Sequence, residues 1–181
     1  MRNKKIKFVP FWKKNNIVLK LFNIFGEKNI KLVGGAVRFA LNNEKTNDLD
    51  FAINIGPDLV KQKLENNAIK FKDKSKGHGT ISIFSKDHVI EITSLRKDIK
   101  TFGRKAKVGF INSFEEDAKR RDFTINSIYS DLEGNLFDPF DGVEDLEKNK
   151  IKFIGIPADR IKEDNLRLLR YFRFVGVYTS N

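Results

Sequence analysis

The chain has 181 residues, of which 40% are hydrophobic and 33% charged, and it contains no cysteine, so a disordered chain, a disulfide scaffold and thiolate metal sites are excluded. Because no apolar run approaches the ~18 residues of a membrane-spanning helix and the basic start lacks the apolar core of a secretory leader, we expect a cytoplasmic protein with one main core. The net charge of +11 suits a polyanionic partner, although it is equally typical of the lysine-rich proteins that an AT-rich genome encodes.

A strand, a glycine turn and a helix form the first predicted unit. Residues 29–33 are typical of a short strand that ends at Gly34-Gly35, and residues 36–41 favour a helix. Because glycine lets the backbone approach a ligand closely, the turn is a possible phosphate cradle. A second strand is predicted at 49–53, and Gly56-Pro57 then precedes a second helix.

Three further strands are predicted at 68–71, 80–84 and 89–95. Because strands and helices are mixed, we expect an α/β or α+β fold. Residues 97–112 are rich in lysine and glycine and show little periodicity, which predicts a mobile basic loop.

A short helix is predicted next, because Ser113 and Glu116 fit a capping box in which each side chain bonds the other residue's backbone amide. Residues 123–129 are strand-like. Two turns follow, and from Pro157 the pattern favours a helix that extends to about Phe174. We place a domain junction near Phe137, which predicts a catalytic domain at 1–136 and a helical region at 137–181.

Two carboxylates, Asp48 and Asp50, are the strongest candidates for chemistry. Side chains two positions apart on a strand project from one face, so both can bind a divalent metal. Mg²⁺ suits the pair because it takes one or two carboxylates together with water and substrate phosphates, and two such ions serve phosphoryl transfer. The alternative is a strand end that faces water. The neighbouring Gly34-Gly35 turn and the positive fork of Arg38, both suited to a triphosphate, favour the functional interpretation.

Glu91 is the candidate third carboxylate. An acid between apolar β-branched residues costs free energy unless it is paired or bound to a metal. A salt bridge to Arg96 or a position facing solvent explains it equally well.

Two further groups combine arginine with acid. Arg121 and Asp122 can share a ribose hydroxyl or a phosphate, although such a pair is more often a surface ion pair. In the last predicted helix, acidic and arginine side chains follow one another at spacings of three and four residues, which favours salt bridges along the helix. Asp and Arg together can also imitate the Watson–Crick edge of a base. The residues of this second group are Glu163, Asp164, Arg167, Arg170 and Arg173.

Five short strings occur in a fixed order along the chain. They are LVGGAVR at 32–38, DLD at 48–50, RRDFTINS at 120–127, DPFDG at 138–142 and EDNLRLLRYFRF at 163–174. In this order the chain resembles the class II tRNA nucleotidyltransferases (CCA-adding enzymes) and the bacterial poly(A) polymerases. The resemblance covers residues 31–174.

The resemblance implies a polymerase-β-like nucleotidyltransferase head with a mixed sheet, followed by a helical neck. It implies that Asp48 and Asp50 carry Mg²⁺, and that CMP and AMP pass from CTP and ATP to the 3′ end of tRNA. It further implies nucleotide-binding roles in which Gly34, Gly35 and Arg38 lie at the phosphates, Arg121 and Asp122 at the ribose, Asp164 and Arg167 at the base, and Arg170 and Arg173 nearby. The stretch 97–112 matches a flexible loop linked to switching between C and A addition.

Two departures from the family pattern leave other activities open. Phe39 stands where the family has Asp, and the helical body and tail domains that hold tRNA in the family are absent, so we expect poor tRNA affinity. Poly(A) addition is one alternative, since it shares every motif. The other is a truncated domain that binds nucleotide or RNA without turnover.

Overall fold

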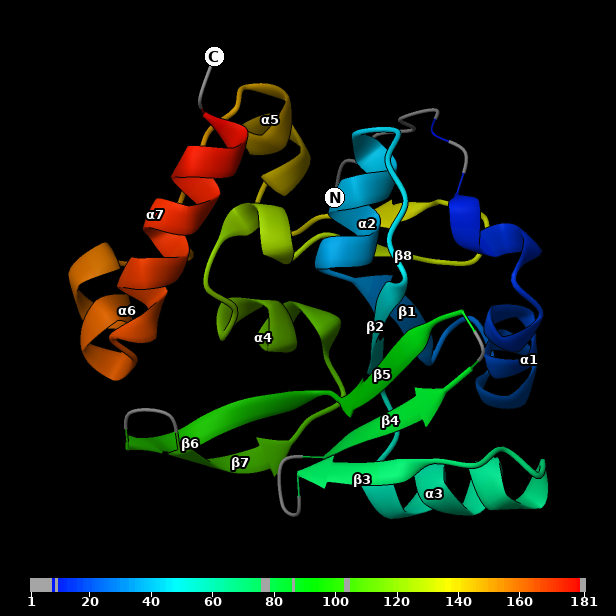
Figure 1. Cartoon of the computed structure of the whole chain (residues 1–181). Coiled ribbons are helices and arrows are strands. Elements are labelled where there is room, and N and C mark those ends of the chain that lie inside the picture. The colour runs from blue at the N-terminus through cyan, green and yellow to red at the C-terminus, as the bar shows by residue number, and fades with distance from the viewer. Residues whose placement is uncertain (1–7, 9, 76–78, 86, 103–104, 180–181) are drawn as a thin grey trace.

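The computed structural model describes residues 8, 10–75, 79–85, 87–102 and 105–179 (Figure 1). Its strands are β1 (Ile30–Val33), β2 (Asp48–Ile53), β3 (Lys72–Ser75), β4 (Thr80–Phe84), β5 (Val89–Ser94), β6 (Arg96–Phe102), β7 (Lys105–Phe110), β8 (Tyr129–Ser130) and β9 (Leu136–Phe137). Its helices are η1 (Phe11–Lys14), α1 (Asn16–Phe25), α2 (Gly35–Leu41), α3 (Pro57–Asn66), α4 (Phe114–Lys119), η2 (Thr124–Asn126), α5 (Gly142–Glu147), α6 (Pro157–Glu163) and α7 (Leu166–Tyr178).

A seven-stranded mixed sheet in the order β3-β4-β5-β2-β1-β8-β9 organises the fold, which confirms the expected mixed class. β2 and β5 pair in parallel, whereas β1 pairs antiparallel with β2 and β8. β6 and β7 form a separate antiparallel pair. Because β2 lies in the middle of the sheet, its side chains meet both layers that cover the sheet.

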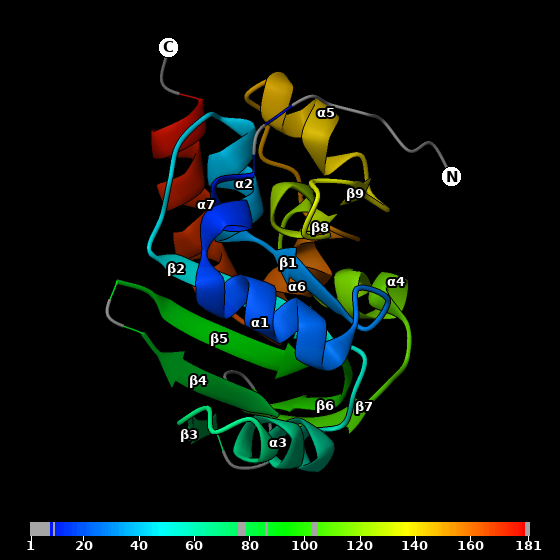
Figure 2. The same ribbon diagram turned by 90° about the vertical axis from the view of Figure 1, so that its right-hand side faces the viewer.

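The main core lies on the sheet face that α1 and α3 cover (Figures 1 and 2). On β2, Leu49, Phe51 and Ile53 point into this core, because side chains alternate between the faces of a strand. The Asn15 side chain begins α1 by accepting hydrogen bonds from the amides of Ile17 at 3.0 Å and Val18 at 3.4 Å. The apolar face of α1 then seals the core.

The opposite face carries the polar side chains of β2 and a smaller apolar cluster. Ala52 and Val33 pack there against Tyr129 and against Ala118 of α4. α6 and α7 lie on this side as well, behind the sheet in Figure 2. Phe174 of α7 packs edge-on against Phe123, with ring centroids 5.4 Å apart. The helical C-terminal region is therefore joined to the sheet domain through aromatic contacts.

Two strand predictions were wrong. The strand predicted at 68–71 lies instead at Lys72–Ser75, because Ala68 has φ +52° and the amide of Ile69 bonds the Leu64 carbonyl at 3.0 Å, which closes α3. The strand-like stretch 123–129 has one isolated bridge, from Phe123 to Phe153, then contains η2, and enters the sheet at Tyr129, where β8 pairs with β1.

The loop predicted at 97–112 was also wrong, because most of it forms the β6–β7 hairpin. The stretch is rich in lysine and interrupted by Gly103 and Gly109, which conceals the alternation of Ala106, Val108 and Phe110 along β7.

The single helix predicted from Pro157 is two helices. Asp164 separates them with φ −154° and ψ 106°, which is extended backbone. Its Oδ1 accepts from the Leu166 amide at 3.1 Å and so supports the start of α7. Within the described part of the chain, no helix has the length and apolar character needed to cross a membrane.

Candidate active site

Three carboxylates meet where β2 and β5 run side by side. In the parallel register Asp50 is the partner of Glu91, and Asp48, two residues earlier, projects from the same face of β2. Desolvation of the carboxylate by the atoms around it, together with the negative charges of Glu91 and Asp48, raises the pKa of Asp50 above the ordinary aspartate value. The predicted third carboxylate therefore does lie beside the predicted pair.

The glycine turn lies against this carboxylate group. Gly34 has φ +71°, a conformation that favours glycine, and a Cβ at this position would lie 3.9 Å from Oδ2 of Asp50. The space around Gly35 is open, since a Cβ there would meet nothing within 4 Å. A ligand that reaches Asp50 can thus also approach the turn closely.

The donor set fits Mg²⁺. Among the described residues, no three His, Cys, Asp or Glu side chains are already grouped as a metal cage. However, Asp48 and Asp50 offer hard carboxylate oxygens from solvent-accessible residues, and Mg²⁺ needs one or two of these beside water and phosphate. The raised pKa of Asp50 reflects desolvation of its carboxylate and then the negative charges of Glu91 and Asp48, which a cation would relieve.

Arg121 lies next to the carboxylates and is fixed by Asp117. Its Nη2 donates to Asp117 Oδ2 at 3.1 Å, and the Tyr129 hydroxyl donates to the same oxygen at 2.9 Å. Burial would raise the pKa of Asp117, but Arg121 and Arg120 hold that pKa below its usual value. Arg121 also lowers the pKa of Asp50. The guanidinium therefore places permanent positive charge at this site.

Asp122 faces the C-terminal helices. It accepts hydrogen bonds from Asn126 Nδ2 at 3.0 Å and from Arg170 Nε of α7 at 2.6 Å. Burial works against ionisation of Asp122, but Arg170 and Asn126 keep its pKa below the ordinary value. Arg170 is thereby brought to Asp122, just beyond the end of α4, and its place near the nucleotide stays a prediction.

Arg38, predicted at the nucleotide phosphates, is buried between α2 and α7. Its Nε donates to the Tyr178 hydroxyl at 2.7 Å, and its Nη1 donates to Asn126 Oδ1. The guanidinium also lies over the Phe174 ring, 4.9 Å from its centroid. Its phosphate contact stays a prediction, whereas its role in joining α2 to α7 is evident.

Arg167 and Arg160 together fasten α6 and α7 to the end of α4. Arg160 Nη2 donates to the carbonyls of Arg120 at 2.6 Å and Arg121 at 2.9 Å. Arg167 Nη1 donates to Glu163 Oε2 at 2.7 Å and to the Arg160 carbonyl at 3.0 Å. The predicted pairing of Glu163 with Arg167 is confirmed. Base recognition by Asp164 and Arg167 stays a prediction.

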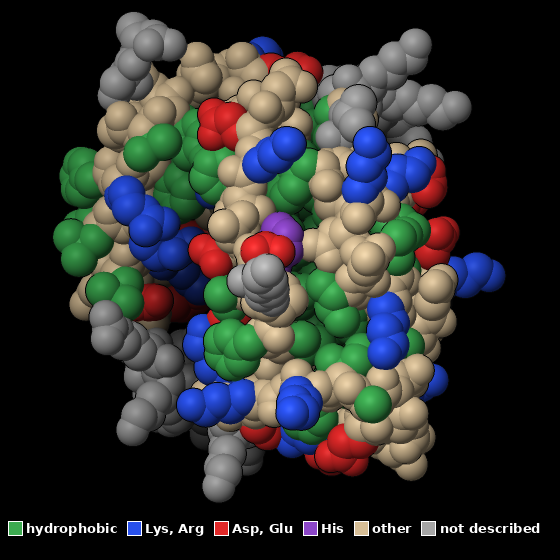
Figure 3. All heavy atoms as spheres, turned by 45° about the vertical axis from the view of Figure 1, so that its right-hand side comes forward, with side chains coloured by type: hydrophobic (Ala, Val, Ile, Leu, Met, Phe, Trp, Pro, Cys, Tyr) green, Lys and Arg blue, Asp and Glu red, His purple; other side chains and the backbone are tan. Residues whose placement is uncertain are grey.

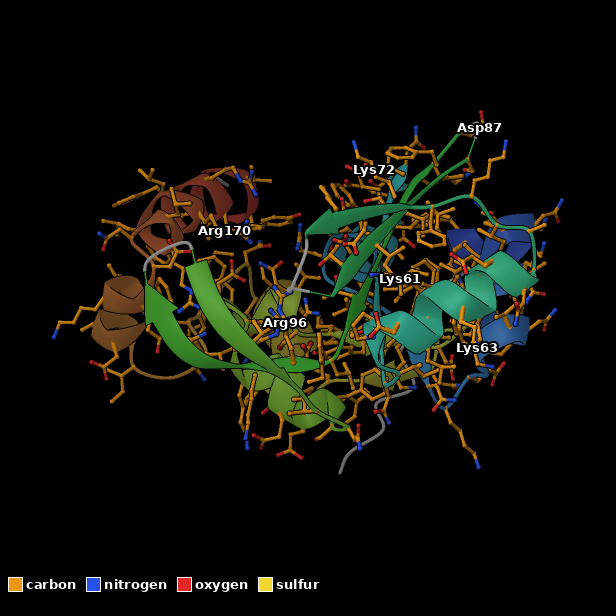
Figure 4. All side chains as sticks on the ribbon, turned by 90° about the horizontal axis from the view of Figure 1, so that it is seen from below. Lys61, Lys63, Lys72, Asp87, Arg96 and Arg170 are labelled. Carbon is orange, nitrogen blue, oxygen red and sulfur yellow. The ribbon has the colours of Figure 1, made fainter. Side chains whose placement is uncertain are left out.

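Arg173 lies apart from these contacts. It is exposed on α7, with its guanidinium 5.2 Å from the centroid of the Phe174 ring. Figure 4 shows the neighbouring Arg170 on α7, well away from Lys61 and Lys63 of α3. On the face shown in Figure 3, basic and acidic side chains rim a recess at the left.

The DPFDG string has a structural role. Asp138 accepts from the amides of Gly142 and Val143, each at 2.9 Å, and so begins α5. Asp145 of α5 accepts from the Thr124 hydroxyl at 2.7 Å. α5 therefore supports η2, which lies between the carboxylates and α7.

Sequence reasoning missed four residues that shape the site: Lys74, Asp117, Asn126 and Arg160. Lys74 forms the ion pair with Glu91 for which Arg96 was the suggested partner. For Asp117, the spacings of three and four residues to Arg120 and Arg121 were a usable signal. Lys74 and Arg160 meet their partners across long sequence separations, where a local pattern gives no signal.

Comparisons with known proteins place the chain in a family. The family model described as the poly A polymerase head domain matches residues 30–152. Human mitochondrial CCA tRNA nucleotidyltransferase 1 is 43% identical over 159 residues, which cover 86% of this chain and 37% of that protein. The CCA-adding enzyme of Enterococcus faecalis is 40% identical over 146 residues, which cover 80% of this chain and 35% of that protein.

Solved structures show the same fold. The Bacillus stearothermophilus CCA-adding enzyme in complex with CTP has a TM-score of 0.77 at 33% identity, and the match covers 94% of this chain and 40% of that one. A tRNA nucleotidyltransferase complexed with a primer tRNA and an incoming ATP analog has a TM-score of 0.68 at 26% identity, covering 88% of this chain and 44% of that one. The chain thus spans little more than a third of the curated relatives it matches.

Proposed function

Because the chain belongs to the family of class II CCA-adding enzymes and poly(A) polymerase head domains, we propose that it transfers CMP and AMP from CTP and ATP to the 3′ end of tRNA. The observation that carries this proposal is the grouping of Asp48, Asp50 and Glu91 beside the Gly34 turn. Each nucleotide added releases pyrophosphate. The division into a head at 1–136 and a neck at 137–181 belongs to the same proposal.

The catalytic end of the site works by charge and position. Asp48 and Asp50 would hold Mg²⁺, which when bound supplies charge neutralisation at the attacking hydroxyl and the leaving pyrophosphate. Glu91 adds negative charge beside Asp50, and Arg121 offers a fixed cation to a phosphate or a ribose hydroxyl. The open space at Gly35 lets a triphosphate approach the backbone.

The other end of the site would select the nucleotide. Asp122 accepts from a ribose hydroxyl, and Asp164 with Arg167 would present an acceptor and donors to the base, with Arg170 and Arg173 nearby. Arg167 makes three hydrogen bonds with protein atoms. Because a guanidinium has five N–H groups, donors are left for a base.

An incorporation assay tests the proposal. Wild-type protein and Asp48→Ala are given Mg²⁺, radiolabelled CTP and ATP, and tRNA that lacks its CCA end. Asp58→Ala is the matched control, since Asp58 is fully exposed on α3. We expect incorporation by wild type and the control and its loss in Asp48→Ala. Equal incorporation by wild type and Asp48→Ala would overturn the proposal.

Poly(A) addition is the second candidate, favoured by the description of the matching family model. ATP alone with a generic RNA distinguishes the two, because a poly(A) polymerase builds a long tail whereas a CCA-adding enzyme does not. Binding of nucleotide or RNA without turnover is the third, favoured by Phe39, which stands where the family pattern has Asp. It predicts Mg²⁺-dependent ATP binding and no incorporation with either primer.

A further inference from the structure

Lys74 lies at an irregularity of the edge strand β3. The antiparallel register with β4 pairs Asp73 with Ile81 and then Ser75 with Thr80, so Lys74 is the extra residue of a β-bulge. A bulge redirects the side chain it carries. The residue before Lys74, Asp73, forms an ion pair with Lys61 of α3, with 2.6 Å between Oδ2 and Nζ.

The Lys74 side chain crosses β4 to reach the carboxylate group. Ser82 of β4 is the register partner of Glu91, and Glu91 is in turn the partner of Asp50. Because Ser82 is small and buried, it leaves room above β4 for a long side chain. Lys74 Nζ forms its ion pair with Glu91 Oε1 across this gap.

Lys74 also affects the two aspartates. It lowers the pKa of Asp50, and the hydrogen bond with Glu91, followed by the charges of Glu91, Asp50 and Asp48, raises the pKa of Lys74. The ammonium group therefore interacts with all three carboxylates. The Lys74 side chain is 59% exposed and that of Glu91 is 25% exposed, so water can reach the ion pair and replace either partner.

We propose that Lys74 is the built-in counter-ion of the Asp48, Asp50 and Glu91 group and that it weakens the binding of a divalent cation there. The inference rests on the metal site of the proposed function. A cation that binds the carboxylates must displace the Lys74 ammonium from Glu91 or bind against its repulsion. Lys74 thus offsets part of the negative charge of the three carboxylates before the metal arrives.

Binding of Mn²⁺ alone, followed by the EPR signal of the free ion, tests this without any assay of activity. Lys74→Gln should lower the dissociation constant about two- to five-fold, the scale of an exposed ion pair. Lys72→Gln is the matched control, because Lys72 is an exposed lysine of the same strand (Figure 4). Lys74→Arg keeps the charge and should bind Mn²⁺ as wild type does, whereas Asp48→Asn should lose binding.

A thermal melt in EDTA gives a second readout. Without its counter-ion, Lys74→Gln should melt below Lys72→Gln, and saturating Mn²⁺ should close the difference. Equal dissociation constants for Lys74→Gln and Lys72→Gln would overturn the role of Lys74 and leave the proposed function standing. If neither wild type nor Lys74→Gln binds Mn²⁺, the metal site of the proposed function fails, and this inference fails with it.

Discussion

Asp122 and Arg170, 48 positions apart in the sequence, form an ion pair with 2.6 Å between Oδ2 and Nε. The pair belongs to a closed network, because Asp122 accepts from Asn126, Asn126 accepts from Arg38, and Arg38 donates to Tyr178. Arg170 and Tyr178 both lie on α7. The network therefore fixes this helix at two points against the segment that carries the candidate ribose-binding residues.

Arg170→Gln should lower the free energy of unfolding by about 1–2 kcal/mol, between the values for an exposed and a buried ion pair. The substitution leaves the buried carboxylate of Asp122 without its cation, which is costly. The cost stays moderate because the Arg170 side chain is 44% exposed, so that solvent already screens part of the ion pair. Urea unfolding measures the change. Arg173→Gln removes the same charge from an exposed position of α7, and a loss as large there would contradict the assigned role of the pair.

Acid should weaken the attachment of α7. The folded-state pKa of Asp122 lies below the ordinary value of 3.8, so near that pH the folded protein binds fewer protons than the unfolded chain. The stabilisation from ionised Asp122 is therefore complete at pH values above the pKa of the unfolded chain. It is lost as the pH falls through the lower pKa of the folded protein. Unfolding midpoints between about pH 5 and 2 should fall less steeply for Asp122→Asn than for wild type. Parallel curves would show that Asp122 does not contribute.

Gly142→Ala should destabilise the protein by at least about 3 kcal/mol, the upper range for overpacking. A Cβ at Gly142 would lie 2.2 Å from the Thr124 carbonyl oxygen and 2.7 Å from its carbon, and backbone cannot rotate away as a side chain can. The substitution should also displace η2 and reduce incorporation. Gly56→Ala is the control, because a Cβ there meets nothing within 4 Å and φ is −63°. Thermal melts of the two variants should differ clearly.

Arg160→Lys should loosen the C-terminal helices while the sheet stays intact. Lysine keeps the positive charge but cannot reproduce the planar fork that bonds the carbonyls of Arg120 and Arg121 together with Glu163. Hydrogen exchange should become faster in α7 and stay unchanged in β2 and β5. Equal protection of α7 in both proteins would show that this contact is dispensable.

Asp50→Asn should abolish nucleotidyl transfer and raise the metal-free melting temperature. Asp50 has a raised pKa because it is partly desolvated beside Glu91 and Asp48, so its ionised form at neutral pH costs free energy in the folded state. Asparagine removes that charge and keeps the shape. A melt in EDTA at pH 7 measures the gain, and a lower melting temperature would contradict the repulsion inferred at this site.

The mixed fold and the carboxylate pair could be predicted because their signals are local. Asp48 and Asp50 are two apart on a strand whose intervening Leu49 is buried, so alternation alone assigns them to the polar face. The β6–β7 hairpin was missed because lysine and glycine are frequent in this stretch and conceal the alternation of Ala106, Val108 and Phe110. The break at Asp164 was missed because the residues on both sides favour helix.

The amino-acid sequence by itself determined the family, through five short strings in a fixed order, and the positions of the glycine turn and of the Asp48–Asp50 pair, since each string consists of neighbouring residues. Only the tertiary structure decided which charges compensate each other. Glu91 pairs with Lys74 rather than Arg96, and Arg38 lies beneath α7, because strand order and helix packing bring distant residues together. Coulomb and hydrogen-bond energies depend on distance in space, and separation along the chain does not specify that distance.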